Sequence, residues 1–265
     1  MFMGTTLILI ILLQAAKWSI VEAEASQARL SDDIQIRQWL TDKLGAREGM
    51  FTFRYEGETN TLSERLSELL NTALYSDPFI RYNVSQYSYH WKGSDRYALV
   101  TLYVDYRETY EQYRSVRAEA KRVVQELMPE GLEEAEQVRW LHDYVVMNVS
   151  YDEGMTHFTA YDAIYKGTTV CQGYALWLQA LLEQAGIASM VVEGTAGETL
   201  HAWNMVEVNG QWYHVDATWD DPVSNEADEV QYGYFMLSDA EMKEDHEWDE
   251  LKTPRADQMY ILEIR

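Results

Sequence analysis

The chain has 265 residues, of which 47% are hydrophobic and 13% aromatic, so it can bury one large core or two smaller ones and is not a disordered protein. Residues 1–130 carry 15 Lys and Arg against 18 Asp and Glu (−3), and residues 131–265 carry 6 against 26 (−20), which together give the −23 of the chain. The acidic half excludes nucleic acid and anionic membranes as its partners, because these bind through basic patches, and it favours a cationic or neutral partner. A generally acidic soluble surface explains the charge equally well.

Residues 1–25 have the pattern of an export signal. Leu7–Leu13 is an aliphatic run too short to span a bilayer but of the length of a signal-peptide core, and Ala23–Ala25 offers a small-x-small cleavage site. The lack of Lys and Arg before the run favours a buried N-terminal segment instead. Because Cys171 is the only cysteine, the chain can form no intramolecular disulfide and no lipid-modified cysteine after a cleaved signal. We expect an extracellular or cell-envelope protein, tethered to the membrane only if this segment is retained.

Residues 26–130 are predicted to form a small β-α-β-β unit followed by a long helix. The first strand is expected at residues 50–55. The capping-box pattern from Thr61 to Glu64 then predicts an amphipathic helix that runs to about Tyr75. The apolar face of this helix consists of Leu62, Leu66, Leu69, Leu70 and Ala73.

A hairpin completes the predicted unit. Its strands are the alternating segments 84–91 and 97–106, and residues 92–95 supply the turn. The sheet is rich in aromatic side chains, which are Tyr87, Tyr89, Trp91, Tyr97 and Tyr103. They could form a ligand platform, but packing and strand propensity explain most of them.

The break Pro129-Glu130-Gly131 predicts a domain boundary near residue 130. A charged helix over about residues 108–127 precedes it, and a second helix over 132–148 leads into the acidic half. The apolar positions of the second helix are Val138, Leu141, Val145 and Val146. Residues 131–265 are therefore expected to form a separate domain.

The only cysteine of the chain lies at the predicted start of an apolar helix. Apolar residues repeat at helical spacing from Ala175 until Gly186 ends the run, and Thr168 and Thr169 before Cys171 can cap the helix. Unpaired N–H groups and the positive end of the helix dipole stabilise a thiolate at such a position. A lone cysteine is also commonly a small buried hydrophobic residue, so this segment alone does not establish a nucleophile.

Two β-prone segments joined by Asn209-Gly210 predict a tight hairpin over about residues 200–216. A two-residue loop places Val208 opposite Gln211, which puts His201 and Asp216 on one face as diagonal neighbours, with Cα atoms roughly 7 to 8 Å apart. His214 falls on the same face opposite Met205, so it is the main rival for any role of His201.

Nucleophilic cysteine chemistry needs a thiolate, an imidazole that holds and returns the proton, and a carboxylate or amide that orients the imidazole. The chain offers these groups in the order Cys171, His201, Asp216. A metal site built from these three residues and His214 is the alternative, but it lacks the closely paired ligands of zinc sites. The other histidines are assigned no role; they are His90, His142, His157 and His246.

The sequence blocks around these residues resemble the transglutaminase-like core of bacterial proteins. The blocks are Val170-Cys171-Gln172-Gly173-Tyr174-Ala175, His201-Ala202-Trp203-Asn204 and the segment from Trp212 to Pro222. They occur in the order and spacing of that family, and the resemblance covers about residues 132–222. It does not cover the β-α-β-β unit or the C-terminal tail.

The resemblance implies a papain-like α+β domain over residues 131–265, with a cysteine-bearing helix packed on an antiparallel sheet. It also implies a catalytic triad of Cys171, His201 and Asp216 and no cofactor or metal. The implied reaction forms a thioester from a carboxamide or peptide bond of a protein or peptide substrate and passes it to water or to an amine. Tyr165 and Gln172 are candidates for a second oxyanion donor. A cationic or lysine-bearing acceptor would suit the acidic surroundings.

A protein that keeps this fold only to bind an envelope polymer or peptide remains the alternative from another class. The tryptophans Trp203, Trp212 and Trp219 are assigned first to core packing and second to the wall of a substrate groove.

Overall fold

The computed structural model describes residues 28–221 and 230–261. The predicted export signal, residues 1–25, lies outside the described residues. The described residues divide into two compact units. The first comprises those up to Ile80 together with Val84–Tyr106, and the second comprises Arg81–Asn83 and the described residues from Arg107 onward. None of the helices in the described ranges combines the length and the apolar character needed to cross a membrane.

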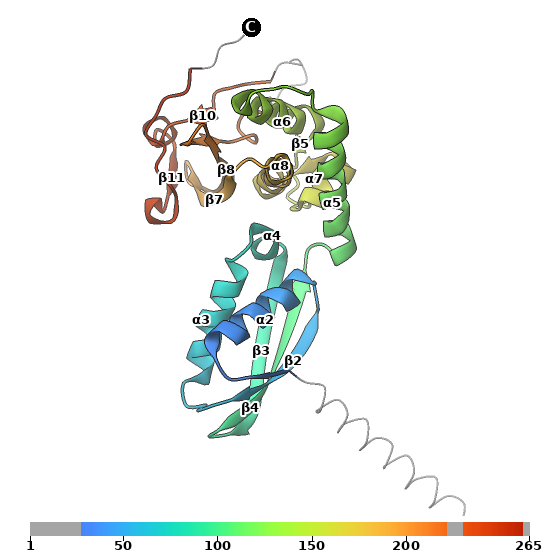
Figure 1. The fold of residues 1–265 in the computed structure, drawn as a ribbon, viewed down its shortest axis with the longest axis vertical. Helices are drawn as coiled ribbons and strands as arrows, with labels where there is room; N and C mark the ends of the chain where they lie inside the picture. The colour runs from blue at the N-terminus through green and yellow to red at the C-terminus, as the bar shows by residue number, and fades with distance from the viewer. Residues whose placement is uncertain (1–27, 222–229, 262–265) are drawn as a thin grey trace, which may run out of the picture. The chain divides into compact units, whose positions relative to one another are not determined.

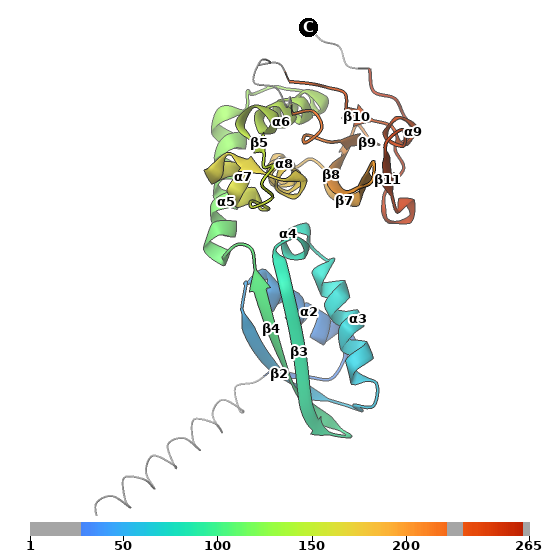
Figure 2. The same ribbon diagram turned by 180° about the vertical axis from the view of Figure 1, so that it is seen from behind.

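The first unit is a four-stranded sheet with the strand order β1-β2-β4-β3, and it carries its helices on one face (Figures 1 and 2). The strands are β1 (Ala28–Leu30), β2 (Met50–Glu56), β3 (Val84–Ser94) and β4 (Tyr97–Tyr106). The helices are α2 (Asp33–Gly45), α3 (Leu62–Leu74) and the short α4 (Pro78–Arg81). The sequence analysis missed β1 and α2, which precede the predicted unit.

The amphipathic helix of this unit is confirmed, since all five positions of its predicted apolar face are buried in the core. Its predicted capping box is wrong, because Thr61 is the N-cap residue but makes no side-chain capping bond. The hairpin turn is also tighter than predicted: Ser94 pairs with Tyr97, so the strands leave only Asp95 and Arg96 between them.

The aromatic side chains of the hairpin divide between the two faces of the sheet. Tyr89 and Trp91 pack against the core, and both donate a hydrogen bond to Ser63 of α3. Tyr97 and Tyr103 are 41% and 44% exposed. Core packing therefore accounts for part of the aromatic set, and the ligand platform stays a prediction.

The second unit begins with a helical layer. Its helices are α5 (Tyr110–Arg122), which continues into the π-helical turn η1 (Val123–Leu127), α6 (Glu134–Asn148), α7 (Ala160–Lys166) and α8 (Cys171–Ala185). Helix α5 packs on α7 and α8, and Arg117 and Glu183 form an ion pair of 2.6 Å between α5 and α8. The boundary predicted near residue 130 is therefore misplaced, because the long charged helix belongs to the second unit.

A five-stranded antiparallel sheet forms the other half of this unit, with the strand order β10-β9-β8-β7-β11. The strands are β7 (Ser189–Ala196), β8 (Thr199–Val208), β9 (Gln211–Val215), β10 (Phe235–Leu237) and β11 (His246–Trp248). Helix α8 packs on β7 and β8, where the buried Asn204 donates hydrogen bonds to Ala175 and Gln179 of the helix. This is the predicted α+β arrangement of a cysteine-bearing helix on an antiparallel sheet.

Short elements complete the second unit. They are the parallel pair β5 (Ser150–Tyr151) and β6 (Thr168–Thr169), helix α9 (Asp239–Met242) and the 3-10 turn η2 (Glu250–Lys252). The segment after β10, which includes α9 and β11, extends beyond the region of the family resemblance and still contributes an edge strand to the central sheet.

Candidate active site

Cys171 is the first residue of α8 and is partly buried. The helix ends as predicted at Gly186, which adopts the left-handed conformation with φ 78°. The predicted threonine caps are wrong: Val170 is the N-cap residue, and Thr169 instead donates its hydroxyl to the carbonyl of His157 at 3.1 Å. The first N–H groups of α8 thus keep no capping side chain, and an anion can bind there.

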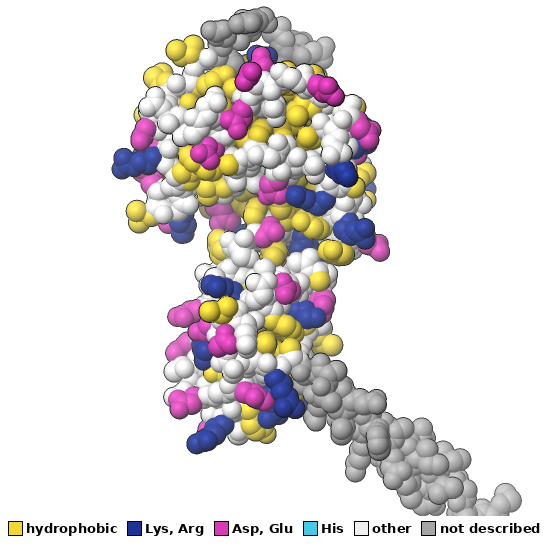
Figure 3. All heavy atoms as spheres, viewed as in Figure 1, with side chains coloured by type: hydrophobic (Ala, Val, Ile, Leu, Met, Phe, Trp, Pro, Cys, Tyr) yellow, Lys and Arg dark blue, Asp and Glu magenta, His cyan; other side chains and the backbone are white. Residues whose placement is uncertain are grey.

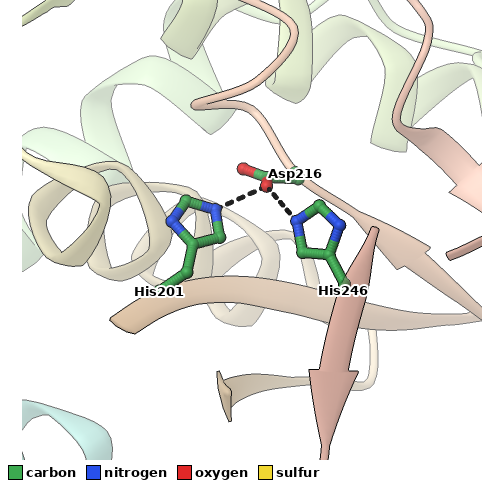
Figure 4. A group of neighbouring side chains, drawn as sticks. All are labelled: His201, Asp216 and His246. Carbon is green, nitrogen blue, oxygen red and sulfur yellow. Dashed lines mark hydrogen bonds and ion pairs between the residues drawn. The ribbon is translucent and has the colours of Figure 1, made fainter. Parts of the chain in front are cut away.

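The predicted hairpin register is confirmed. Strands β8 and β9 pair Val208 with Gln211 and Met205 with His214, and Asn209 and Gly210 between them have positive φ angles of 52° and 76°. This register brings His201, near the start of β8, to Asp216, directly after β9. His201 Nε2 lies 2.6 Å from Asp216 Oδ2, so the two side chains meet as predicted (Figure 4).

The His201 side chain also reaches Cys171. Burial lowers the pKa of His201, but the Asp216 carboxylate, together with a hydrogen bond to Cys171 and the charge of its thiolate, raises that pKa to about 10. Because Nε2 is bound to Asp216, Nδ1 is the ring nitrogen left to face the thiol. The structure therefore brings all three predicted side chains together, with the imidazole between the thiol and the carboxylate.

Asp216 is completely buried, and hydrogen-bond donors surround it. Its Oδ1 accepts from the backbone N–H groups of Thr218 and Trp219 at 3.0 and 3.3 Å, and its Oδ2 accepts from His201 and His246. Burial raises the pKa of this carboxyl group, whereas the charges and hydrogen bonds of the two histidines lower it to about 2. Asp216 is therefore ionised at neutral pH although it is out of contact with solvent.

His214, the predicted rival of His201, has other partners. Its Nδ1 accepts from the Trp203 indole at 2.9 Å, and its Nε2 lies 2.9 Å from Asp239 Oδ1. Burial lowers the pKa of this histidine despite the nearby Asp239. Because Nδ1 accepts a hydrogen bond, the proton of the neutral ring lies on Nε2. With both ring nitrogens bound in this way, His214 supports the packing of the sheet.

His246 is the residue that the sequence analysis missed. It lies on the edge strand β11, is 1% exposed, and places Nε2 3.3 Å from Asp216 Oδ2 (Figure 4). Its three-residue strand shows no periodic pattern, and only pairing of β11 with β7, His246 opposite Ala196, brings it to the site. The single sequence signal was a histidine flanked by Asp245 and Glu247, which also fits an exposed acidic turn.

The candidates for a second oxyanion donor also change. Tyr165 is 49% exposed and its ring lies 4.6 Å from that of Tyr161, and Gln172 donates its side-chain amide to the carbonyl of Tyr82 at 3.5 Å. The Tyr82 hydroxyl is buried. Burial raises the pKa of Tyr82, and the charge of Glu193, a hydrogen bond to Glu193 and the charge of Cys171 raise it further. Tyr82 is therefore a donor close to Cys171 that the sequence analysis did not consider.

The three tryptophans divide as the sequence analysis ranked them. Trp203 is 1% exposed and Trp212 packs partly buried on the same core. Trp219 is 38% exposed, and its ring lies 6.0 Å from that of His201 and 4.6 Å from that of His246. Only Trp219 is thus both accessible and adjacent to the histidine pair.

A metal could be held by one group in the described part of the chain. His201, Asp216 and His246 offer ligand atoms that lie within 4.8 Å of one another. The set predicted as an alternative, with Cys171 and His214, is not the one assembled. Because the ligand atoms of the assembled group already hydrogen-bond to each other, we assign no metal to it.

Comparisons with known proteins find similarity to transglutaminase-like proteins. The model of the transglutaminase-like superfamily matches residues 121–217, which contain all three predicted site residues. Kyphoscoliosis peptidase of Homo sapiens and that of Mus musculus are each 26% identical over 203 residues, 64% of this chain. The aligned region spans only 30% of the length of these relatives. A crystal structure of a TGase is similar with a TM-score of 0.35 and 13% identity, covering 69% of this chain and 55% of that one.

Residues 121–217 thus carry a transglutaminase-like domain, and the second unit, which contains them, has the predicted papain-like α+β fold. The matched region carries Cys171, His201 and Asp216.

Proposed function

We propose that the protein is a cysteine acyltransferase or cysteine protease of the transglutaminase-like class, with Cys171, His201 and Asp216 as its catalytic triad. The observation that supports the proposal is the position of the His201 ring, which reaches the only thiol of the chain on one side and a buried, ionised carboxylate on the other. Nucleophilic cysteine catalysis requires this order of groups.

In the proposed reaction, the Cys171 thiolate attacks the carbonyl carbon of a carboxamide or peptide bond, and a C–S bond forms. The His201 imidazolium gives its Nδ1 proton to the departing amine as the C–N bond breaks, which leaves a thioester. Asp216 holds Nε2–H of the ring throughout and stabilises its positive charge. Water or an amine then attacks the thioester carbonyl, and neutral His201 takes the proton from that nucleophile. The C–S bond breaks, which releases the acid or the new amide and returns Cys171 as the thiolate.

The negative charge on the carbonyl oxygen would develop near the free N–H groups at the start of α8. One well-placed donor of this kind contributes about 3 kcal/mol to the transition state. The Tyr82 hydroxyl is our candidate for a second donor, because it is buried and close enough to Cys171 for the charge of the thiolate to raise its pKa.

The charge of the second unit favours a cationic or lysine-bearing acceptor. No Lys or Arg occurs between Lys166 and Lys243, a segment that includes all three proposed catalytic residues. Asp and Glu side chains are scattered over the face of the unit seen in Figure 3 rather than gathered in one patch. A spread-out negative field attracts amines without a specific binding pocket. Residues 1–25 lie outside the described structure, and export to the cell envelope or exterior stays part of the proposal.

The pH dependence of iodoacetamide labelling tests the nucleophile, because the chain has only one thiol to report. A thiolate–imidazolium pair predicts a labelling midpoint well below about 8.5, the value of an ordinary thiol, and an upward shift of that midpoint on His201→Ala. Cys171→Ala must abolish labelling. A midpoint near that of an ordinary thiol, or labelling that requires denaturant, refutes the proposal and leaves a non-catalytic binding protein with this fold.

A second experiment separates the two acceptors. A glutamine-containing protein is offered with and without a primary amine such as biotin-pentylamine, and released ammonia, free peptide ends and incorporated biotin are measured. Biotin incorporation that depends on Cys171 identifies transfer to amines, whereas new peptide ends or ammonia without incorporation identify hydrolysis.

A further inference from the structure

The Asp216 carboxylate lies between two imidazole rings. On the side opposite His201, His246 Nε2 approaches the same oxygen, Oδ2, at 3.3 Å, compared with 2.6 Å for His201 (Figure 4). The other nitrogen of His246, Nδ1, lies 2.5 Å from Asp245 Oδ1, and the second oxygen of Asp245 accepts from the Tyr234 hydroxyl at 2.5 Å. His246 is thus the only described side chain, besides His201, that hydrogen-bonds to Asp216.

Both partners of His246 are carboxylates. An ionised carboxylate can only accept hydrogen bonds, and a neutral imidazole has only one N–H group. A neutral His246 would therefore turn a lone pair toward either Asp216 or Asp245. The contact with Asp216 requires only that Nε2 carries a proton, which it then donates to Oδ2.

The surroundings hold the His246 ring in this orientation. Its ring packs edge-on against Trp203 at 5.1 Å and against Trp219 at 4.6 Å between ring centroids. The backbone of His246 pairs with Ala196 of β7, whose neighbour β8 carries His201. A buried ring with both nitrogens engaged and two aromatic neighbours has little freedom to turn.

We propose that His246 is a positioning residue of the active site, which holds Asp216 in the orientation that lets it accept the hydrogen bond from His201. The inference rests on the proposed function, because it extends the triad to a fourth member. His246 touches no reacting atom and acts only through Asp216. Its effect follows from geometry, since small displacements of a group that orients the reacting atoms are costly to rate.

Two substitutions test this role. His246→Phe keeps a planar ring but removes both ring nitrogens, and His246→Gln keeps an N–H donor that can reach Asp216. We expect His246→Phe to lower the rate of iodoacetamide labelling of Cys171 at pH 6 by about tenfold or more and to raise the labelling midpoint. His246→Gln should restore most of the wild-type profile.

His142→Phe is the matched control. His142 is equally buried in the second unit, with Nε2 3.1 Å from Asp220 Oδ2 and Nδ1 3.0 Å from Asp143, but it makes no hydrogen bond to Asp216. Loss of either ring should lower stability in urea, whereas only His246→Phe should change the labelling profile. Equal profiles for the two phenylalanine variants would show that His246 is merely structural.

Proton NMR of histidine-labelled protein provides a readout that does not depend on a reactive thiol. The Nε2–H proton of His201, in its 2.6 Å bond to Asp216, should give a strongly downfield signal. That signal should be lost or broadened in His246→Phe and retained in His246→Gln. If wild-type Cys171 behaves as an ordinary thiol, the proposed function fails, and this signal still decides the role of His246. A signal unchanged in His246→Phe overturns the inference.

Discussion

At the scale of the residue, the His201–Asp216 pair couples the stability of the protein to pH. The pKa of His201 is raised from 6.5 to about 10, and that of Asp216 is lowered from 3.8 to about 2, in both cases chiefly because each ion stabilises the other against the cost of burial. The stabilisation due to a raised pKa is fully present below the unfolded value and disappears as the pH rises to the folded value. For a lowered pKa, the stabilisation is present above the unfolded value and disappears as the pH falls to the folded one.

We therefore predict that His201→Gln destabilises the protein most between about pH 4 and 6.5, where both groups are charged in the wild-type protein whether folded or unfolded. The difference in free energy of unfolding between wild type and variant should shrink as the pH rises from 6.5 to 10, and again as it falls from 3.8 to 2. Urea titrations across this range provide the measurement. A difference that stays constant between pH 6.5 and 10 would mean that His201 is uncharged in the folded protein.

At the scale of the element, the start of α8 is fixed by close packing rather than by a capping side chain. A Cβ atom on Gly173 would lie 2.0 Å from Thr169 Oγ1, a hydroxyl that is already bound to the carbonyl of His157. The first turn of the helix therefore lies directly against the strand that precedes it. This contact sets the position of the Cys171 backbone relative to β6.

Gly173→Ala should cost about 1 to 3 kcal/mol of stability, because a methyl group is forced into a filled space. It should also change the labelling rate of Cys171, since the helix start or Thr169 must shift. Gly186→Ala is the matched control at the other end of α8, where φ is 78° and no atom lies within 4 Å of the added carbon. The control should cost about 1 kcal/mol through backbone strain alone and leave labelling unchanged. Similar labelling in both variants would show that Gly173 does not position the thiol.

At the scale of the whole molecule, the charge is concentrated in the half that carries the site, at −20 of the total −23. This distribution should act on small charged reagents before any specific contact forms. The Debye screening length, over which a charge is felt in solution, is about 30 Å at 0.01 M salt and only about 3 Å at 1 M. The positive His201 beside Cys171 opposes this field at short range.

We predict that anionic iodoacetate alkylates Cys171 more slowly than neutral iodoacetamide at low salt, by about tenfold beyond their intrinsic difference. The intrinsic difference is measured on a small neutral thiol. Added salt should raise the iodoacetate rate and leave the iodoacetamide rate nearly unchanged. An iodoacetate rate that is relatively fast at low salt and falls with added salt would show that the local positive charge of His201 dominates.

Particular elements show how far the sequence alone could be used. The Asn209-Gly210 loop determined the pairing of β8 with β9 because a two-residue turn permits one register, and this was enough to bring His201 to Asp216. The apolar face of α3 and the end of α8 at Gly186 were likewise predictable from local pattern. The caps were not, because Thr61 and Thr169 have the residue type of a cap, but Thr61 makes no capping bond and Thr169 binds a different carbonyl.

The sequence by itself thus determined which chemical groups the candidate site contains and where each lies in its helix or strand. Helix starts and hairpin registers depend on neighbouring residues, so a local pattern is enough to predict them. Only the tertiary structure decided which groups meet. It assigned α5 to the second unit through packing on α7 and α8, and His214 to the sheet through Trp203. It also brought His246, 30 residues beyond Asp216, to the buried carboxylate. Contacts of this range depend on how the edge strand β11 packs, and no local pattern in a three-residue strand records that packing.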